Sequence, residues 1–296
     1  MMSTTEGPTD RYAVAGNPVA HSQSPFIHAT FAQATGQRLH YDRLFCPLDD
    51  FAATLRGFAA STASADGLNG PARGCNVTVP FKFQANDLAT RRSDRAALAL
   101  AANTLRFDPD GWYADNTDGV GLVRDIEANA GVEMRGRRVL LLGAGGGAAG
   151  ALGALLQAGP SLLRIVNRTP ANAQQLAQRH QPLALAHEVE LQAAGLDDAG
   201  SGFDVVINAT TSSLQQAAVP LPAAVLRPRG LAFDMMYGAP AQGFLQWAAE
   251  HDAVGRDGLG MLVEQAAEAF TVWRGVRPAT AEVLQLLRRR LQSATA

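Results

Sequence analysis

The sequence predicts an α/β protein of two domains, and three observations lead to that prediction. The chain has 296 residues, which is about twice the length of a typical domain. Its hydrophobic content of 47% and charged content of 18% are typical of a globular chain with buried cores. Short apolar strand patterns alternate with helical patterns, an order typical of mostly parallel sheets covered by helices.

The first half of the chain contains several expected elements. Periodicity and turn signals predict strands over 12–16, 40–45 and 76–79, a hairpin over 101–114, and helices over 25–35 and 49–60. We expect Asp49 or Asp50 to cap the second of these helices. Ligands of parallel sheets gather at the carboxyl ends of the strands, so the substrate is expected at that edge.

Lys82 is the only lysine among the 25 lysines and arginines. It follows the expected strand Asn76-Val77-Thr78-Val79, and Pro80 is suited to start the helix that would carry Lys82 in its first turn. Lysine can release a proton whereas arginine in a protein cannot. Lys82 is therefore a candidate for proton transfer, although a chance survivor of an arginine-rich composition explains the single lysine equally well.

Three other side chains lie near expected helix starts. Ser22 and Ser24 offer two hydroxyls beside the helix that Pro25 begins, a place suited to a carboxylate or phosphate, although a serine there often only caps the helix. Asp118 begins the helix that runs to about Ala128. It could simply cap that helix, or it could orient Lys82 and exchange protons with it.

A glycine-rich turn predicts a dinucleotide site in the second half. Gly143-Ala144-Gly145-Gly146-Gly147-Ala148 follows the expected strand 138–142 and opens the expected helix 148–156, the context in which such a turn binds a pyrophosphate. The next strand, 163–166, is followed by Asn167-Arg168-Thr169 where NAD-binding domains usually carry an acid. Arg168 in that place favours the 2′-phosphate of NADP.

The rest of the chain predicts further strands over 203–208 and 230–235, and helices over 261–273 and 281–292. In the helix 261–273 we expect Gln265 on or beside a buried stripe, where its amide needs a partner. The members of that stripe are Leu262, Ala266, Ala269, Phe270 and Trp273. The uncharged run 139–159 is long enough to cross a bilayer, but its glycines favour a buried strand, turn and helix.

Composition bounds the other possibilities. The net charge is −2 without a long basic cluster, so a nucleic-acid partner is not expected. Cys46 and Cys75 are the only cysteines, and the polar start of the chain has no apolar signal segment, so we expect a cytoplasmic protein. No His, Cys or carboxylate spacing typical of a metal site is present, and no membrane association is expected.

Together these motifs resemble the shikimate dehydrogenase family. The resemblance spans nearly the whole chain in the family's order. The matching stretches are Gly16-Asn17-Pro18 with Ser22 and Ser24, Asn76 to Lys82, Asn103-Thr104, Asn116 to Gly119, the glycine turn, Asn167-Arg168-Thr169, Asn208-Ala209-Thr210, and Asp257 to Met261 with Gln265.

The resemblance implies NADP-dependent, reversible reduction of 3-dehydroshikimate to shikimate, a step of chorismate and aromatic amino acid biosynthesis. It implies that Lys82 and Asp118 are the catalytic pair. The substrate-binding residues that it implies are Ser22, Ser24, Asn76, Thr78, Lys82, Asn103, Asp118, Tyr237 and Gln265. The cofactor-binding residues that it implies are Gly143 to Ala148, Asn167, Arg168, Thr169, Thr210, Gly258 and Met261.

The resemblance also implies a substrate domain over 1–117 and 258–296, a Rossmann-like NADP-binding domain over 118–257, and a monomer or homodimer. Many relatives carry a second basic residue where this chain has Asn172, so Arg168 is expected to bind a 2′-phosphate with less help. Two alternatives are an NAD-using quinate/shikimate dehydrogenase and a non-catalytic sensor on the same scaffold. Arg168 argues against NAD, the serine pair favours the smaller shikimate, and a sensor would not need both Lys82 and Asp118.

Overall fold

The computed structural model describes residues 9–64, 67–210 and 221–293, and the chain divides into two compact units. Unit 1 comprises Met1–Thr117 and Ala266–Val283, and unit 2 comprises Asp118–Gln265 and Leu284–Ala296. The residues Thr211, Ser212 and Ser213, which follow the motif Asn208-Ala209-Thr210, lie outside the described part of the chain.

Unit 1 is built on a six-stranded sheet. Its elements are β1 (Asp10–Gly16), α1 (Ser24–Thr35), β2 (Leu39–Phe45), α2 (Phe51–Ala60), β3 (Ala72–Val77), α3 (Lys82–Leu88), β4 (Arg91–Arg92), α4 (Asp94–Ala99), β5 (Thr104–Arg106) and β6 (Tyr113–Asp115). The strand order is β2-β1-β3-β5-β6-β4. β1 pairs in parallel with β2 and β3, while β5 runs antiparallel to β3 and β6, so the sheet is mixed and the expected hairpin is present.

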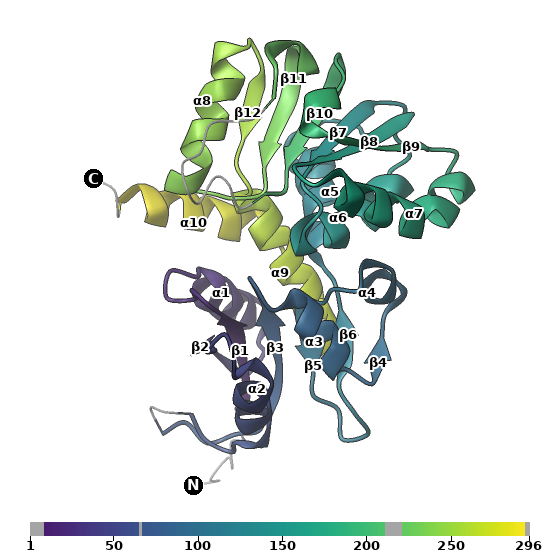
Figure 1. Cartoon of the computed structure of the whole chain (residues 1–296). Helices are drawn as coiled ribbons and strands as arrows, with labels where there is room; N and C mark the ends of the chain where they lie inside the picture. The colour runs from purple at the N-terminus through teal and green to yellow at the C-terminus, as the bar shows by residue number, and fades with distance from the viewer. Residues whose placement is uncertain (1–8, 65–66, 211–220, 294–296) are drawn as a thin grey trace, which may run out of the picture. The chain divides into compact units, whose positions relative to one another are not determined.

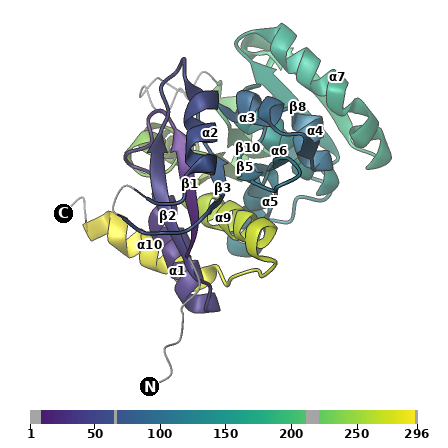
Figure 2. The same cartoon turned by 90° about the horizontal axis from the view of Figure 1, so that it is seen from below.

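The two faces of this sheet are covered by different helices. On one face Cys75 and Val77 pack with Phe51 of α2 and with Phe81 and Ala85 beside and within α3. The aromatic side chains of β1 and β2 form the other core, where Tyr41 stacks on His28 of α1. Figure 2 shows α1 and α2 on opposite sides of the strands. Because side chains alternate along a strand, one residue step in β3 moves a side chain from one core to the other.

Three local predictions for unit 1 were inaccurate. β3 ends at Val77 rather than Val79, because the chain turns at Thr78, whose carbonyl accepts a hydrogen bond from the Phe81 amide (3.1 Å). Pro80 lies in that turn, and Lys82 itself is the first residue of α3. Asp50 precedes α2, but its side chain makes no capping hydrogen bond.

Unit 2 is built on a second six-stranded sheet, in which every strand pairs in parallel. Its strand order is β12-β11-β10-β7-β8-β9. The elements from position 118 onward are α5 (Asp118–Arg124), a π-helical turn (Asp125–Asn129), β7 (Arg138–Leu142), α6 (Gly146–Gln157), β8 (Leu162–Asn167), α7 (Pro170–Ala186), β9 (Glu190–Gly195), β10 (Phe203–Asn208), β11 (Leu226–Asp234), α8 (Gln242–Glu250), β12 (Val254–Arg256), α9 (Leu259–Arg274) and α10 (Ala281–Ser293), with short 3-10 turns at Leu196–Asp198, Ala223–Val225 and Ala239–Ala241.

The core of unit 2 explains why its strands are almost continuously apolar. Leu140 and Val206, from adjacent strands, pack with Phe244 and Trp247 of α8. Figure 1 shows α8 beside β11 and β12 at one end of the sheet and α7 beside β8 and β9 at the other. A parallel sheet buried on both faces produces the unbroken apolar strands seen in the sequence. The uncharged run 139–159 is indeed a strand, a glycine turn and a helix.

Two boundaries and one helix face differ from the sequence-based predictions. β11 begins at Leu226 rather than near Gly230. The prediction missed this start because the first residues of the strand are mostly polar and carry no strand pattern. α6 begins at Gly146, two residues before the expected start. In α9, Leu262 is only half-buried, while Val263 and Ala267 are fully buried, so the buried arc is wider than one stripe.

Among the described residues, no helix combines the length and the apolarity that crossing a membrane requires. Within the same ranges, no group of three His, Cys, Asp or Glu side chains is placed to hold a metal ion.

Candidate active site

The two serines lie side by side at the start of α1. The Ser22 hydroxyl donates to the Ser24 hydroxyl at 3.2 Å and accepts a longer bond from the Ser24 amide at 3.3 Å. Arg43 of β2 donates two hydrogen bonds, of 3.1 and 2.6 Å, to the Ser22 carbonyl. Arg43 therefore anchors the serine loop and places a cation beside it, a contribution that sequence reasoning missed.

Asn76, Thr78 and Asn103 meet at the carboxyl end of β3. The Val77 amide donates to the Asn103 carbonyl at 2.8 Å, and Asn76 Nδ2 donates to the same oxygen at 3.1 Å. A Cβ at Gly16 would lie 2.3 Å from Thr78 Cγ2, so only glycine lets the two loops approach this closely. The polar residues of the two loops therefore face one edge of the sheet.

Lys82 joins this group through the backbone. Its carbonyl accepts a hydrogen bond from the Ala102 amide at 2.8 Å, which holds the start of α3 beside Asn103. Its side chain is half-buried. Unit 1 thus brings Ser22, Ser24, Asn76, Thr78, Asn103 and Lys82 to the carboxyl ends of β1 and β3, the edge at which the sequence predicted the substrate residues.

In unit 2, Asp118 is buried to 1% exposure at the first residue of α5. Two glycines of α5 allow close packing around it. A Cβ at Gly119 would lie 2.7 Å from the Gly150 carbonyl of α6, and one at Gly121 would lie 2.7 Å from the Gln265 amide. This packing holds the helix of Asp118 against the helix of Gln265.

The glycine turn has the geometry that anion binding requires. Gly143 has a φ of 113°, which favours glycine, and its amide donates to the Val166 carbonyl at 2.8 Å. α6 starts without a side-chain cap, and a Cβ at Gly145 would meet nothing within 4 Å. The first amides of α6 therefore lie beside open space, where they could bind a pyrophosphate.

Thr210 and Gly258 lie at the same edge as the glycine turn. A Cβ at Gly143 would lie 3.1 Å from Thr210 Cγ2, and the Thr210 hydroxyl donates to Asn208 Oδ1 at 2.7 Å. A Cβ at Gly258 would lie 2.3 Å from the Met235 carbonyl, at the end of β11. Tyr237 follows the same strand and is half-buried, and Met261 lies in the first turn of α9.

Arg168 lies exposed after β8, and no carboxylate among the described residues forms an ion pair with it. The next residue, Thr169, precedes α7 without capping it through its side chain, and Asn167 Nδ2 donates to the Thr169 carbonyl at 2.9 Å. An unpaired guanidinium beside an open helix start can bind a phosphate. Asn172 adds no second cation in the first turn of α7.

A buried ion pair that the sequence did not predict supports the start of α9. Asp125 is fully buried, and its carboxylate accepts hydrogen bonds from Arg256 at 2.5 and 3.2 Å. A Cβ at Gly260 would lie 1.9 Å from Asp125 Oδ1, so a side chain there would displace the carboxylate. The pair holds the segment that contains Gly258 and Met261. A lone aspartate within a helical pattern carries no sequence signal for this role.

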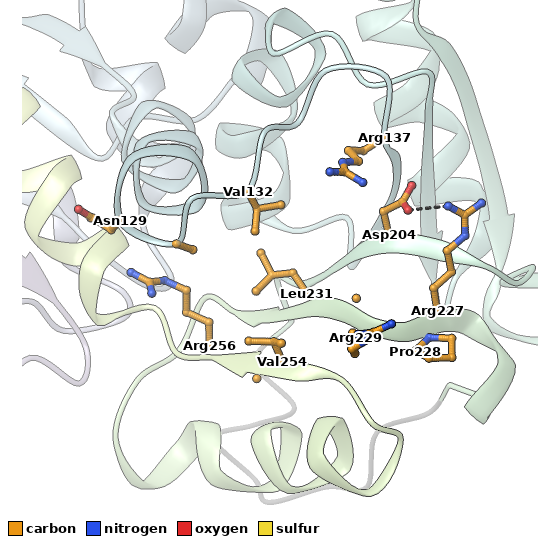
Figure 3. Close-up of a pocket in the computed structure, with 13 residues that line it drawn as sticks. Asn129, Val132, Arg137, Asp204, Arg227, Pro228, Arg229, Leu231, Val254 and Arg256 are labelled. Carbon is orange, nitrogen blue, oxygen red and sulfur yellow. Dashed lines mark hydrogen bonds and ion pairs between the residues drawn. The ribbon is translucent and has the colours of Figure 1, made fainter.

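A pocket of about 530 Å³ lies elsewhere in unit 2, at the amino ends of β7 and β10 (Figure 3). Four arginines line it, but Arg227 already pairs with Asp204 and Arg256 with Asp125. The remaining two, Arg137 and Arg229, are exposed. Because all strands run in parallel, this pocket lies at the edge opposite the glycine turn and contains none of the predicted cofactor residues.

A parallel sheet with an uncapped glycine turn, joined to a second α/β unit that gathers serine, asparagine and lysine side chains, defines a dinucleotide-dependent enzyme of polar substrates. Family models match three stretches: the shikimate dehydrogenase substrate binding domain over 14–105, shikimate / quinate 5-dehydrogenase over 126–219, and the shikimate 5′-dehydrogenase C-terminal domain over 258–288. The chain belongs to the shikimate dehydrogenase family.

Individual relatives support this family assignment. A shikimate dehydrogenase (NADP(+)) of Methylibium petroleiphilum is 64% identical over 285 residues, which cover 96% of each chain. One from Acidovorax is 59% identical over 279 residues, covering 94% of this chain and 96% of the relative. The crystal structure of the Thermus thermophilus shikimate 5-dehydrogenase with NADP(H) and shikimate is 30% identical, with a TM-score of 0.79 over 94% of this chain and 98% of that one.

Proposed function

We propose that this protein is an NADP-dependent shikimate dehydrogenase, which reversibly reduces 3-dehydroshikimate to shikimate in chorismate and aromatic amino acid biosynthesis. The observation that carries the most weight is the relative of that name, 64% identical over 96% of both chains. Within that frame, the adjacent hydroxyls of Ser22 and Ser24 support a carboxylate site, and the uncapped start of α6 supports a pyrophosphate site.

The substrate residues are assigned from the family resemblance, and the polar edge of unit 1 supports those that it contains. Ser22 and Ser24 bind the substrate carboxylate, with Arg43 adding a favourable charge behind them. The ring hydroxyls are bound by Asn76, Thr78, Asn103, Asp118 and Gln265, and Tyr237 lies near the substrate and nicotinamide.

The cofactor residues fit NADP. The turn Gly143 to Ala148 binds the pyrophosphate at the start of α6, and Arg168 with Asn167 and Thr169 binds the 2′-phosphate. Thr210, Gly258 and Met261 line the nicotinamide end. The unpaired state of Arg168 among the described residues supports this assignment, because the guanidinium does not have to break an ion pair to bind a phosphate.

Lys82 and Asp118 form the catalytic pair of this proposal. The nicotinamide supplies the hydride when NADPH is bound. Lys82 stabilises the charge that develops on the substrate oxygen and donates a proton to it during reduction. Asp118, at the start of α5, orients the ammonium group of Lys82 and exchanges protons with it.

The proposal also covers the domain boundaries, the cellular location and the oligomeric state. The substrate-binding domain comprises 1–117 and 258–296 and the nucleotide domain 118–257, a division supported at position 118 by the boundary between the two units. The protein acts in the cytoplasm as a monomer or homodimer. A quinate/shikimate dehydrogenase using NAD is the second candidate, and Asn172 is the residue that leaves room for it.

The direct test is product identification. The purified chain is incubated with 3-dehydroshikimate and NADPH, and the products are separated and identified by mass spectrometry. We expect stoichiometric shikimate and NADP⁺. Oxidation of NADPH without formation of shikimate, or no reaction at all, would show that the proposed activity is wrong.

A further inference from the structure

A buried tyrosine connects several of the proposed substrate residues. Tyr41 of β2 is 6% exposed, and its hydroxyl donates to Asn76 Oδ1 at 2.7 Å. Burial raises the pKa of Tyr41, and hydrogen bonding with Ser24 acts in the opposite direction. One buried hydroxyl of β2 thus binds the Asn76 side chain of β3 directly.

The Asn76 side chain also forms hydrogen bonds with Asn103 and Thr104. Its Nδ2 donates to the Asn103 carbonyl and to Thr104 Oγ1, both at 3.1 Å. An asparagine side chain has two N–H donors and an oxygen with two lone pairs, so both donors and one lone pair are already used by the protein. Only one lone pair remains for a substrate hydroxyl, and the amide is held in one orientation.

The hydrogen bonds continue to the residue before Asp118. The Thr104 hydroxyl, fully buried, donates to Asn103 Oδ1 at 2.9 Å. The same oxygen accepts from the Thr117 amide at 2.9 Å, and Asn103 Nδ2 donates to the Thr117 hydroxyl at 2.9 Å. A continuous chain of hydrogen bonds therefore runs from Tyr41 to the peptide unit that leads into Asp118.

His28 fixes the other end of this chain. Its ring stacks on the Tyr41 ring with centroids 4.2 Å apart and an angle of 8°. His28 is fully buried, and among the described residues no group makes a well-aligned hydrogen bond to either ring nitrogen. Burial lowers its pKa to about 3, with the nearby Asn76 amide acting weakly in the opposite direction. The neutral ring therefore offers a flat aromatic face against which the Tyr41 ring is packed.

We propose that Tyr41, held in place by His28, is a positioning residue of the substrate site, which orients Asn76 and, through Thr104 and Asn103, the peptide before Asp118. This proposal rests on the proposed function, because the aligned groups are those assigned to the substrate. Tyr41 itself touches no reacting atom. Its hydroxyl sets the geometry in which shikimate is bound and oxidised.

Tyr12 provides a matched control for testing this role. It is 2% exposed and packs in the same apolar cluster as Tyr41, together with Val14 and Val19. Among the described residues, its hydroxyl accepts one hydrogen bond, from Arg274 at 3.5 Å, and forms none with a substrate residue. Tyr12→Phe and Tyr41→Phe therefore each remove one buried hydroxyl from the same core, and only the second removes a link to Asn76.

The experiment compares kcat and KM for shikimate, KM for NADP⁺ and the melting temperature of the wild type and both variants. We expect Tyr41→Phe to lower kcat/KM for shikimate roughly 3- to 10-fold, the scale of one lost hydrogen bond, with KM for NADP⁺ within twofold of wild type. Tyr12→Phe should keep wild-type kinetics at a similar melting temperature. Wild-type kinetics for Tyr41→Phe, or equal kinetic losses in both variants, would overturn the proposal.

A second measurement separates positioning from general stability. Thr104→Val removes the next hydroxyl of the chain with little change in volume. If Tyr41 acts through Asn76 and Thr104, the kinetic losses of Tyr41→Phe and Thr104→Val should not add in the double variant, whereas additive losses would contradict the relay. If the wild type itself is inactive, the proposed function is wrong. Failure of the proposed function is therefore distinguishable from failure of the positioning role of Tyr41.

Discussion

Replacing Arg168 with glutamine tests the cofactor assignment most sharply. Arg168 is exposed after β8, unpaired among the described residues, and adjacent to the uncapped start of α7. Glutamine keeps most of the side-chain length and removes the charge. If Arg168 binds the 2′-phosphate of NADP, the variant should bind NADP⁺ more weakly and NAD⁺ unchanged.

The size of the effect follows from the exposure of the side chain. A hydrogen bond to a charged group contributes about 1.5–3 kcal/mol, and the lower end applies here because solvent screens an exposed guanidinium. Asn172 supplies no second cation that could compensate. A loss of about 1.5 kcal/mol corresponds to a roughly tenfold higher Kd for NADP⁺. Isothermal titration calorimetry at low and high salt measures the Kd for NADP⁺ and for NAD⁺.

Arg137→Gln is the matched control, because Arg137 is also an exposed arginine of unit 2 but precedes β7, at the opposite edge of the sheet. It should leave both affinities within twofold of wild type. Equal losses of NADP⁺ and NAD⁺ affinity in Arg168→Gln, or no loss of either, would refute the phosphate assignment. The difference between wild type and Arg168→Gln should also shrink as salt increases.

Three further predictions concern catalysis and stability. Lys82→Ala should lower kcat roughly 10²–10⁴-fold with NADP⁺ affinity nearly unchanged, and near-normal turnover would remove Lys82 from the chemistry. Asp125→Asn should lower the free energy of unfolding in urea by about 3 kcal/mol, the lower end for a broken buried pair because the Arg256 side chain is 19% exposed, and a loss below about 1 kcal/mol would contradict this. Burial lowers the pKa of His28 to about 3 and of His180 to about 4, so between pH 6.5 and 5 the unfolded chain binds more protons than the folded one. Stability should therefore fall with decreasing pH, by up to about 1.4 kcal/mol per pH unit for each histidine, and a flat urea midpoint across this range would count against it.

Much of the fold could be predicted because its strands are short, apolar and punctuated by glycine and proline. The unbroken apolar strand Arg138–Leu142 and the glycines after it define the second sheet from sequence alone. β11 was placed too late because its opening Leu226-Arg227-Pro228-Arg229 is polar. β4 and β12 were not predicted, since short edge strands carry little periodic signal.

The candidate site was predictable where its residues stand in local motifs. The serine pair and the glycine turn are read within a few positions of sequence, and the structure places each at the carboxyl edge of its own sheet. The residues that support the site could not be predicted, because their hydrogen-bond partners are distant in sequence. Tyr41 bonds Asn76 across 35 positions and Arg256 bonds Asp125 across 131, so neither pair leaves a local pattern.

The most direct test of the account is a comparison of initial rates for shikimate and quinate, each with NADP⁺ and with NAD⁺, followed by nicotinamide absorbance. The account predicts that shikimate with NADP⁺ has the highest kcat/KM of the four pairs. A higher kcat/KM for quinate, or for NAD⁺ with either substrate, would contradict it.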